Sequence, residues 1–308
     1  MGREELLAPE MYNFVSEIEK FAQNKERLAL RWQNESGDKQ SVKLTVNEFV
    51  TLRADQSNNK TQLGRYDGEK IIPLVYRKCK PYGISPRSAG QYFLQEALME
   101  DADKVPLVIV KGMAGTSKTF YSLAVGLEKM LNSSQVDYRK ILVTRPNAQF
   151  DADIGFLPGS EQEKISPLMR PIIDNLEQLL DSNEEERYKN EKELKGKIEE
   201  IFDRGIIATE AMNFIRGRSF VNTYLIIDEA QNMTPKQITG IITRAGKGTK
   251  VILLGDPNQI DTAFLDERTN GLSYAAERMK GSKLCYQITL LPSECERSKL
   301  ASESIKRM

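Results

Sequence analysis

Residues 112–119 read G-M-A-G-T-S-K-T, a composition suited to a loop that cradles phosphate. They follow an apolar run at 105–110 and precede a helical stretch, which is where such a loop must lie. Glycines let backbone N–H groups close around phosphate oxygens, a lysine reaches the outer oxygens, and a final hydroxyl ligates Mg²⁺. Lys118 and Thr119 would take these last two roles. The predicted nucleoside triphosphate site comprises Gly112, Met113, Ala114, Gly115, Thr116, Ser117, Lys118 and Thr119.

The loop departs from the pattern G-x-x-x-x-G-K-[ST] at Ser117, which replaces the glycine before the lysine. We interpret it as a tolerated variant, because a residue in the first turn of a helix can adopt ordinary helical angles. The alternative is that the added Cβ crowds the loop and gives weak nucleotide binding or slow hydrolysis, by nature or by engineering.

Two carboxylates, Asp228 and Glu229, directly follow the apolar run 225–227. Ligands of open α/β sheets bind at the carboxyl ends of the strands, so both side chains are expected beside a phosphate-bound Mg²⁺. In a P-loop NTPase the first carboxylate holds the metal's water shell, and a following glutamate polarises the attacking water. We therefore assign Asp228, with Thr119, to the metal and Glu229 to the general base.

A further apolar run, 251–254, is followed by G-D-P-N-Q at 255–259. The neutral amide of Gln259 can contact an outer phosphate and its attacking water without adding negative charge, so we assign it as a sensor. A simple turn is the alternative, because G-D-P-N is also strong turn chemistry.

The composition excludes several kinds of chemistry. The 308 residues include no histidine, which removes imidazole metal sites, Ser-His-Asp triads and histidine bases. The 44 basic and 44 acidic side chains cancel, so nucleic acid would have to bind a local stripe or groove. Cys79, Cys285 and Cys295 are odd in number and form no C-x-x-C pair, as is typical of reduced thiols in a cytoplasmic protein. No apolar stretch is long enough to predict a membrane span.

Apolar, β-branched runs alternate with helical segments over most of the chain. The runs lie at 105–110, 141–144, 224–227, 251–254 and 288–291. This alternation is typical of strands buried on both faces of a parallel sheet, and it predicts an α/β fold of the P-loop NTPase class. A helix at 86–100, with Ser85 as N-cap and Pro86 at its first position, is expected ahead of the phosphate loop.

The amino-terminal part has a different pattern. Residues 11–21 repeat apolar positions at helical spacing, whereas 28–32, 42–46 and 48–52 alternate as short antiparallel strands do. This pattern predicts a helical lead-in followed by a small β-rich module.

Residues 161–204 interrupt the α/β alternation with a helical stretch whose second half, 184–200, is almost wholly polar. A polar helix is typical of a solvated arm, with a dedicated binding site as the alternative. The expected domains are a helical lead-in at 1–26, a small β-rich module at 27–80, and a P-loop ATPase domain at 81–308 with a helical insertion at 161–204.

Ten short motifs occur in a fixed order along the chain. They are N-E-F-V-x-L at 47–52, L-G-R-Y-D-G at 63–68, G-I-x-P-R at 83–87 with Gln91, G-x-A-G-T-x-K-T at 112–119, T-R-P at 144–146, D-I-G-F-L-P-G at 153–159, R-G-R at 216–218, D-E-A-Q-N at 228–232, T-R-x-G at 243–246 and G-D-x-x-Q-I-D at 255–261. From residue 47 onwards the chain resembles the PhoH family of ATPases, relatives of the first motor domain of superfamily-one helicases. The resemblance implies a RecA-like sheet.

The resemblance is closest to PhoH proteins whose ATPase follows a PIN ribonuclease domain, because the first two motifs belong to the segment that joins the two. Only 46 residues precede Asn47, whereas a PIN domain needs about a hundred or more. We expect that nuclease domain to have been lost or removed, and we carry over no nuclease activity.

The resemblance also implies roles for side chains outside the loop. Gln91 would read adenine, since its amide can donate and accept at the base edge. Arg297 would be an arginine finger supplied to a neighbouring subunit, with Arg244 as second choice. Arg216 and Arg218 would contact nucleic acid or that subunit, or be solvated.

The leading functional prediction is an ATPase that uses ATP and Mg²⁺, assembles as a homo-oligomer, expected to be a hexameric ring, and acts on single-stranded RNA as a helicase or remodelling motor. A nucleotide-dependent regulatory module that hydrolyses little is the alternative, motivated by Ser117 and the balanced charge. A small-molecule kinase is weaker, because the sequence has no lid-like arginine cluster.

Overall fold

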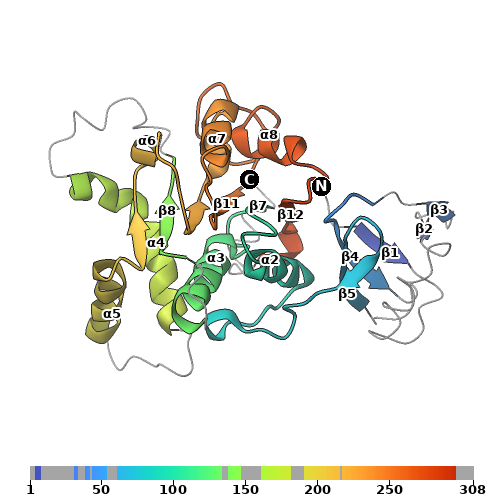
Figure 1. Ribbon diagram of the computed structural model, residues 1–308, viewed down its shortest axis with the longest axis horizontal. Helices are drawn as coiled ribbons and strands as arrows, with labels where there is room; N and C mark the ends of the chain where they lie inside the picture. The colour runs from blue at the N-terminus through green and yellow to red at the C-terminus, as the bar shows by residue number, and fades with distance from the viewer. Residues whose placement is uncertain are drawn as a thin grey trace.

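The computed structural model describes residues 4–7, 31–33, 39–41, 44–53, 61–133, 138–146, 161–181, 191–215 and 217–295. A six-stranded sheet occupies the middle of this part of the chain, and a four-stranded sheet lies to its side (Figure 1). A two-stranded antiparallel hairpin accompanies the smaller sheet.

The elements have the following bounds. The strands of the large sheet are β7 Leu107–Lys111, β8 Lys140–Thr144, β9 Ile207–Thr209, β10 Thr223–Ile227, β11 Lys250–Gly255 and β12 Cys285–Thr289. The helices are α2 Ala89–Met99, α3 Lys118–Leu127, α4 Glu161–Asp181, α5 Glu191–Asp203, α6 Met212–Ile215, α7 Pro235–Ile242 and α8 Gly271–Arg278. The smaller strands are β1 Glu4–Leu7, β2 Arg31–Gln33, β3 Lys39–Ser41, β4 Phe49–Arg53, β5 Thr61–Tyr66 and β6 Ile71–Pro73.

The large sheet is parallel throughout, in the order β12-β7-β11-β10-β8-β9. Its central strands β10 and β11 are buried along their whole length, as expected when helices cover both faces, and are mostly apolar after Thr223 and Lys250 at their first positions. The predicted α/β class, with a mostly parallel sheet flanked by helices and a small β-rich sheet at the amino-terminal side, is confirmed.

The helices form a layer on each face of this sheet. α2 and α3 pack on one face, α4 packs against α3, and α7 and α8 lie on the other side (Figure 1). Successive residues of β7 point to opposite faces, so Val108 and Val110 join one hydrophobic cluster while Leu107 and Ile109 join the other. The helices leave uncovered the edge of the sheet at which the strands end, where the loops after β7, β10 and β11 lie.

The helix predicted at 86–100 begins three residues later than expected. Ser88, not Ser85, is the N-cap, and its hydroxyl accepts a hydrogen bond from the Gln91 N–H. Pro86 therefore lies ahead of the helix, because the serine that can reach an unpaired N–H of the first turn decides where it starts.

The apolar run at 288–291 also predicted the wrong position for the last strand of the sheet. It spans Cys285–Thr289 instead of 288–291, in register with Leu107 to Lys111 of β7. Pro292 begins a 3₁₀ turn directly after Leu291, and because proline has no N–H it cannot extend the ladder.

The smaller sheet has the order β1-β4-β5-β6, with β4, β5 and β6 antiparallel. The predicted strand at 48–52 corresponds to β4, whereas 44–46 are not in a strand and lead into a turn. Glu4–Leu7 form a strand parallel to β4 inside the predicted lead-in at 1–26, and the helix predicted at 11–21 lies outside the described residues.

Asn47 joins the two sheets. Its Nδ2 lies 3.1, 3.2 and 3.3 Å from the carbonyl oxygens of Ser282, Lys283 and Cys285, where the chain enters β12. Arg65 of β5 donates to Asn47 Oδ1 at 2.7 Å. The smaller sheet is thus held against the large one by hydrogen bonds to backbone.

The helical stretch predicted at 161–204 is present as α4 and α5, but α5 is not a purely solvated arm. It packs against α4 and β9 and buries Ile198 and Ile201, so its charged residues form one face of an amphipathic helix. Within the described part of the chain, no helix has both the length and the apolar character needed to span a membrane. Cys79, Cys285 and Cys295 all lie in that part, and none of them is joined in a disulfide there.

Candidate nucleotide site

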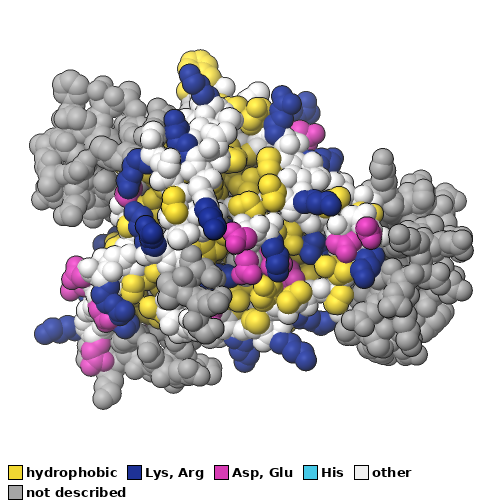
Figure 2. Space-filling model, in the orientation of Figure 1, with side chains coloured by type: hydrophobic (Ala, Val, Ile, Leu, Met, Phe, Trp, Pro, Cys, Tyr) yellow, Lys and Arg dark blue, Asp and Glu magenta, His cyan; other side chains and the backbone are white. Residues whose placement is uncertain are grey.

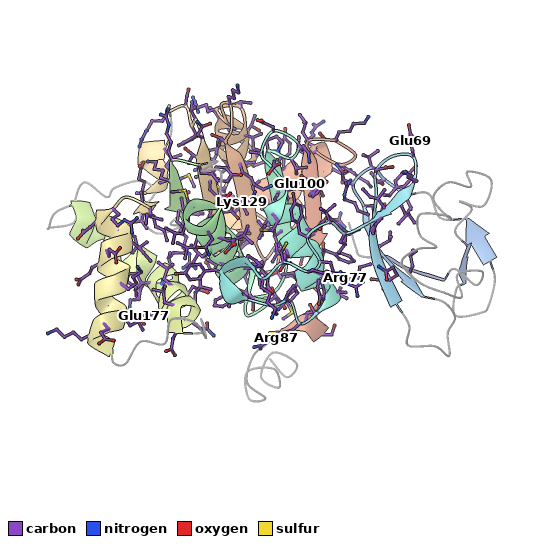
Figure 3. The ribbon with its side chains drawn as sticks, turned by 60° about the horizontal axis from the view of Figure 1, so that its bottom comes forward. Glu69, Arg77, Arg87, Glu100, Lys129 and Glu177 are labelled. Atoms are coloured by element: carbon purple, nitrogen blue, oxygen red, sulfur yellow. The ribbon has the colours of Figure 1, made fainter. Side chains whose placement is uncertain are left out.

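A cleft of about 690 Å³ opens at the carboxyl edge of the large sheet. This volume suits a small-molecule ligand. Its lining comprises Gly83, Ile84, Ser85, Arg87, Gln91, Ala114, Gly115, Ser117, Lys118, Thr119, Phe120, Tyr121, Arg145, Pro171, Asn175, Gln178, Asp228, Glu229, Asp256 and Gln259. Figure 3 labels Arg87, ahead of α2, and Glu177, on α4, which mark the segments on either side of α3 in that view.

The strand order explains why the predicted groups meet. β11 lies between β7 and β10 in the sheet, so the loop after β7, the segment after β11 and the acidic pair after β10 follow one another along the same edge. Asp228, Glu229 and Gln259 consequently line one cleft with five residues of the loop, namely Ala114, Gly115, Ser117, Lys118 and Thr119. The other predicted loop residues, Gly112, Met113 and Thr116, are not among its lining residues.

The loop itself is tightly built. The Gly112 N–H donates to the Gly255 carbonyl at 3.1 Å, and a Cβ on Gly112 would come within 2.9 Å of Leu290 and of the Thr116 hydroxyl. Lys118 Nζ donates to the carbonyls of Gly112 at 2.6 Å and Met113 at 2.9 Å. The Lys118 ammonium therefore lies within the loop, where the predicted phosphate would bind.

Ser117 does not adopt ordinary helical angles, and that prediction was wrong. Its φ of 61° and ψ of 23° lie in the left-handed region, at the residue that precedes α3. A side chain with a Cβ costs about 1 to 2 kcal/mol there, whereas glycine adopts the conformation freely. The glycine pattern of such loops thus reflects a backbone requirement that Ser117 meets under strain.

Thr119 and Asp228 connect the loop to the acidic pair. The Thr119 hydroxyl donates to Asp228 Oδ1 at 3.1 Å. Burial raises the pKa of the Asp228 carboxyl, and the neighbouring Glu229 raises it further, while Arg145, Lys118 and the Thr119 hydrogen bond act in the opposite direction. A buried carboxylate beside a hydroxyl is a place where a bound cation would restore the charge balance.

These two side chains fit Mg²⁺, which is usually held by one or two protein oxygens together with substrate phosphates and waters. In the described residues no cluster of three or more Asp, Glu, Cys and His side chains could hold a metal.

Glu229 is held from two sides. Its Oε1 accepts from Arg145 Nη2 at 2.9 Å, and its Oε2 accepts from Gln231 Nε2 at 2.6 Å. Glu229 also has a left-handed backbone, with φ of 55°. Left-handed conformations of non-glycine residues persist where surrounding contacts determine them, and here two side chains do so.

Gln231 links the acidic pair to the segment after β11. Besides Glu229, its Nε2 donates to the Gln259 carbonyl at 2.7 Å, and its Oε1 accepts from the Asp256 N–H at 3.1 Å. Gln231 is fully buried, whereas the Gln259 side chain is exposed and lines the cleft. The G-D-P-N segment is therefore both a turn and part of the cleft wall.

Gln91 is buried, with 2% of its surface exposed, and it lines the cleft from α2. Its Oε1 accepts from the Arg87 N–H at 2.7 Å. The amide of Gln91 is therefore fixed at the cleft, where the sequence predicted an adenine reader.

Of the two arginines assigned to a neighbouring subunit's site, the structure describes Arg244, which lies away from the cleft. Arg244 is exposed at the end of α7, and its carbonyl accepts from the Phe220 N–H, just ahead of β10. That position is at the opposite edge of the sheet from the cleft. Arg218 pairs with Glu210, and Arg216 and Arg297 lie outside the described residues.

Several lining residues were missed by sequence reasoning. Arg145 and Asp256 lie inside quoted motifs, but neither received a role. Pro171, Asn175 and Gln178 belong to α4, whose contact with α3 brings it to the cleft. The T-R-P motif was a usable signal for Arg145, whereas the position of α4 depends on tertiary packing.

The parallel sheet, the loop ahead of α3 and the acidic pair after β10 define the P-loop NTPase class of α/β proteins. Comparison with known families places the chain within that class. The family model described as PhoH-like protein matches residues 83–308, and the chain belongs to this family. The resemblance inferred from the ten motifs is confirmed at that level.

Individual relatives agree with the family assignment. The chain is 38% identical over 251 residues to Protein PhoH2 of Bacillus subtilis (strain 168), covering 80% of this chain and 54% of that protein. It is 36% identical over 261 residues to Protein PhoH of Escherichia coli (strain K12), covering 82% and 68% respectively. The chain spans about half the length of the PhoH2 relatives it matches.

Proposed function

We propose that this chain binds ATP together with Mg²⁺ and hydrolyses it. The observation that carries the proposal is the single cleft that gathers Lys118, Thr119, Asp228, Glu229 and Gln259. Phosphoryl transfer needs positioning and charge stabilisation more than covalent chemistry, and these side chains supply both kinds of group.

Each side chain has a defined task in this proposal. Lys118 exchanges its two loop carbonyls for outer phosphate oxygens, and Glu229 accepts the proton of the attacking water. Gln259 orients that water from the segment after β11. Thr119 and Asp228 hold the Mg²⁺, which supplies charge neutralisation on the phosphate oxygens. Gln91 reads the adenine edge, with Arg87 fixing its amide.

We further propose that the chain works as a homo-oligomer, a hexameric ring, on single-stranded RNA in the cytoplasm. The resemblance to one half of a helicase motor supports this proposal, since the second wall of the cleft would come from another copy. Arg244, at the far edge of the sheet, could serve only a neighbour's cleft. On the face shown in Figure 2, basic and acidic side chains are interspersed, which favours a local RNA groove over a broad basic patch.

A second candidate is a nucleotide-dependent regulatory module with little hydrolysis. Two observations favour it: the strained Ser117 in the loop and the engagement of both Glu229 carboxylate oxygens. A protein of this kind would bind ATP tightly and change a partner without rapid turnover.

The experiment that separates the two is an ATPase assay with and without single-stranded RNA or DNA, alongside a mass measurement in solution with ATP and Mg²⁺. We expect turnover that RNA stimulates and that Lys118→Ala abolishes, with particles larger than a monomer. Tight ATP binding without turnover would favour the regulatory module. Monomers alone at working concentration would contradict the ring and the finger supplied in trans.

A further inference from the structure

The two oxygens of Glu229 are both committed to protein donors, Arg145 Nη2 at 2.9 Å and Gln231 Nε2 at 2.6 Å. Each carboxylate oxygen keeps a second lone pair, but a guanidinium held against one oxygen occupies space from which the attacking water must approach a general base. The Gln231 contact belongs to a fully buried amide that also holds the segment after β11. The Arg145 contact is therefore the one that can be released without dismantling the wall.

Arg145 is placed for such a release by the sheet. β8 pairs with β10 so that Thr144 lies opposite Ile227, and the next residues of the two strands, Arg145 and Asp228, leave the sheet side by side. The Arg145 and Glu229 side chains are 25% and 28% exposed, and both line the cleft. An anion entering the cleft can thus reach the guanidinium.

We infer that Arg145 is a positioning residue that pairs with Glu229 until a nucleoside triphosphate binds, and then exchanges this carboxylate for the outermost phosphate. This inference rests on the proposed function and deepens it. A guanidinium presents a planar fork that suits phosphate and carboxylate oxygens equally, so the exchange replaces one charge-assisted pair with another. Glu229 is released for water only when the triphosphate is in place.

The exchange resembles what Lys118 must do, since its ammonium is also bound within the protein, to the carbonyls of Gly112 and Met113. The cations of the described cleft lining are Arg87, Lys118 and Arg145. Of these three, Arg145 forms an ion pair with the proposed base. The device would limit hydrolysis to a site that already holds the outer phosphate.

The test is a double-mutant cycle on affinity for a non-hydrolysable ATP analogue, measured by titration calorimetry with Mg²⁺. If Arg145 must leave Glu229 to meet the phosphate, Glu229→Gln removes the competing partner and tightens binding of the analogue by about fivefold, as expected for a partly exposed pair. In an Arg145→Gln background the same change should alter affinity by less than about twofold.

Two controls separate this effect from simple removal of negative charge. Asp256→Asn removes another carboxylate of the cleft, and its effect on affinity should be the same with and without Arg145. ADP lacks the outermost phosphate, so Glu229→Gln should tighten ADP binding little in either background. Arg145→Lys keeps the charge without the fork and should retain part of the coupling if Arg145→Gln binds too weakly to measure.

Equal tightening by Glu229→Gln in both Arg145 backgrounds, or the same coupling with ADP as with the analogue, would overturn the inference. Loss of both ADP and analogue binding in Arg145→Gln and Arg145→Lys would also overturn it, because Arg145 would then hold nucleotide generally. Failure of the wild-type chain to bind any nucleotide would instead reject the proposed function, so the two failures are distinguishable.

Discussion

Each of the two walls of the cleft contains a non-glycine residue with left-handed backbone angles, and the two residues are supported differently. The loop wall holds Ser117 at φ 61°, and the acidic wall holds Glu229 at φ 55°. Glu229 is fixed by hydrogen bonds from two side chains, whereas within the described part of the chain the Ser117 hydroxyl makes no hydrogen bond that caps α3. The two residues have similar backbone angles, but among the contacts of the residues that the structure describes, side-chain hydrogen bonds support only the conformation of Glu229.

This difference indicates what each strained residue does. Strain that neighbouring contacts determine is typical of a side chain that must be aimed at a ligand. The conformation of Ser117 is required by the loop's path, and its side chain adds only cost. We therefore expect changes on the acidic wall to affect chemistry and changes at Ser117 to affect mainly stability and loop freedom.

The largest effect is expected for Glu229→Gln, which keeps the shape of the acidic wall and removes its base. Turnover should fall by about a hundredfold or more while ATP binding is retained. Single-turnover hydrolysis with a parallel binding titration measures both. Glu277→Gln, an exposed change on α8, is the matched control and should leave turnover unchanged. Retained turnover in Glu229→Gln would reassign the base and remove the contrast between the walls.

Gln231→Leu tests whether the acidic wall is braced as described. The change leaves the Asp256 N–H and the Gln259 carbonyl without the partners they have now. We expect the free energy of unfolding to fall by about 2 kcal/mol, the cost of unsatisfied buried groups. Chemical denaturation measures this, with the exposed Gln178→Leu as a control expected to change it by under about 0.5 kcal/mol. Equal effects of the two variants would show that the brace is not needed.

Thr119→Ala removes the hydrogen bond from the Thr119 hydroxyl to Asp228, which links the two walls. If this hydroxyl also ligates Mg²⁺, half-maximal turnover should require about tenfold more Mg²⁺, because one oxygen of the site is lost. A magnesium titration of the ATPase rate measures the shift. Thr119→Ser keeps the hydroxyl and should behave like the wild type; an unchanged titration in Thr119→Ala would place the metal elsewhere.

Ser117→Gly should have the smallest effect and the opposite sign. Relief of the left-handed strain should raise the free energy of unfolding by about 1 kcal/mol, and we expect hydrolysis to become faster. Ser122→Gly, a change inside α3 where the backbone is helical, is the matched control and should lower stability by about 0.5 to 1 kcal/mol. If both glycine variants destabilise the protein equally, the strain assigned to Ser117 is absent.

The sequence predicted the sheet well where burial alone sets the pattern. β8, β10 and β11 are continuous apolar runs and appear close to where these runs lie. β12 was misplaced because Tyr286 and Gln287 interrupt its apolar pattern, and α2 because two serines, Ser85 and Ser88, could each have capped it. These choices depend on register and on hydrogen bonds that a pattern does not contain.

The sequence predicted several of the side chains that line the cleft but not which hydrogen bonds they form. Strand order brings Asp228, Glu229 and Gln259 to the loop, and chain spacing was sufficient to expect that. The partners of Glu229 could not be read in the same way, because Arg145 comes from a separate strand and the Glu229 backbone takes an unusual conformation. Side-chain pairing across strands needs the register, which only the folded chain supplies.

The hydrogen bonds of Asn47 have a mechanical consequence. They clamp the smaller sheet onto the entry to β12, which runs beside β7, the strand that ends in the phosphate loop. A force on the smaller sheet is therefore transmitted through these hydrogen bonds to β12 and β7. Movement of the smaller sheet would reach the loop that follows β7 through only two neighbouring strands.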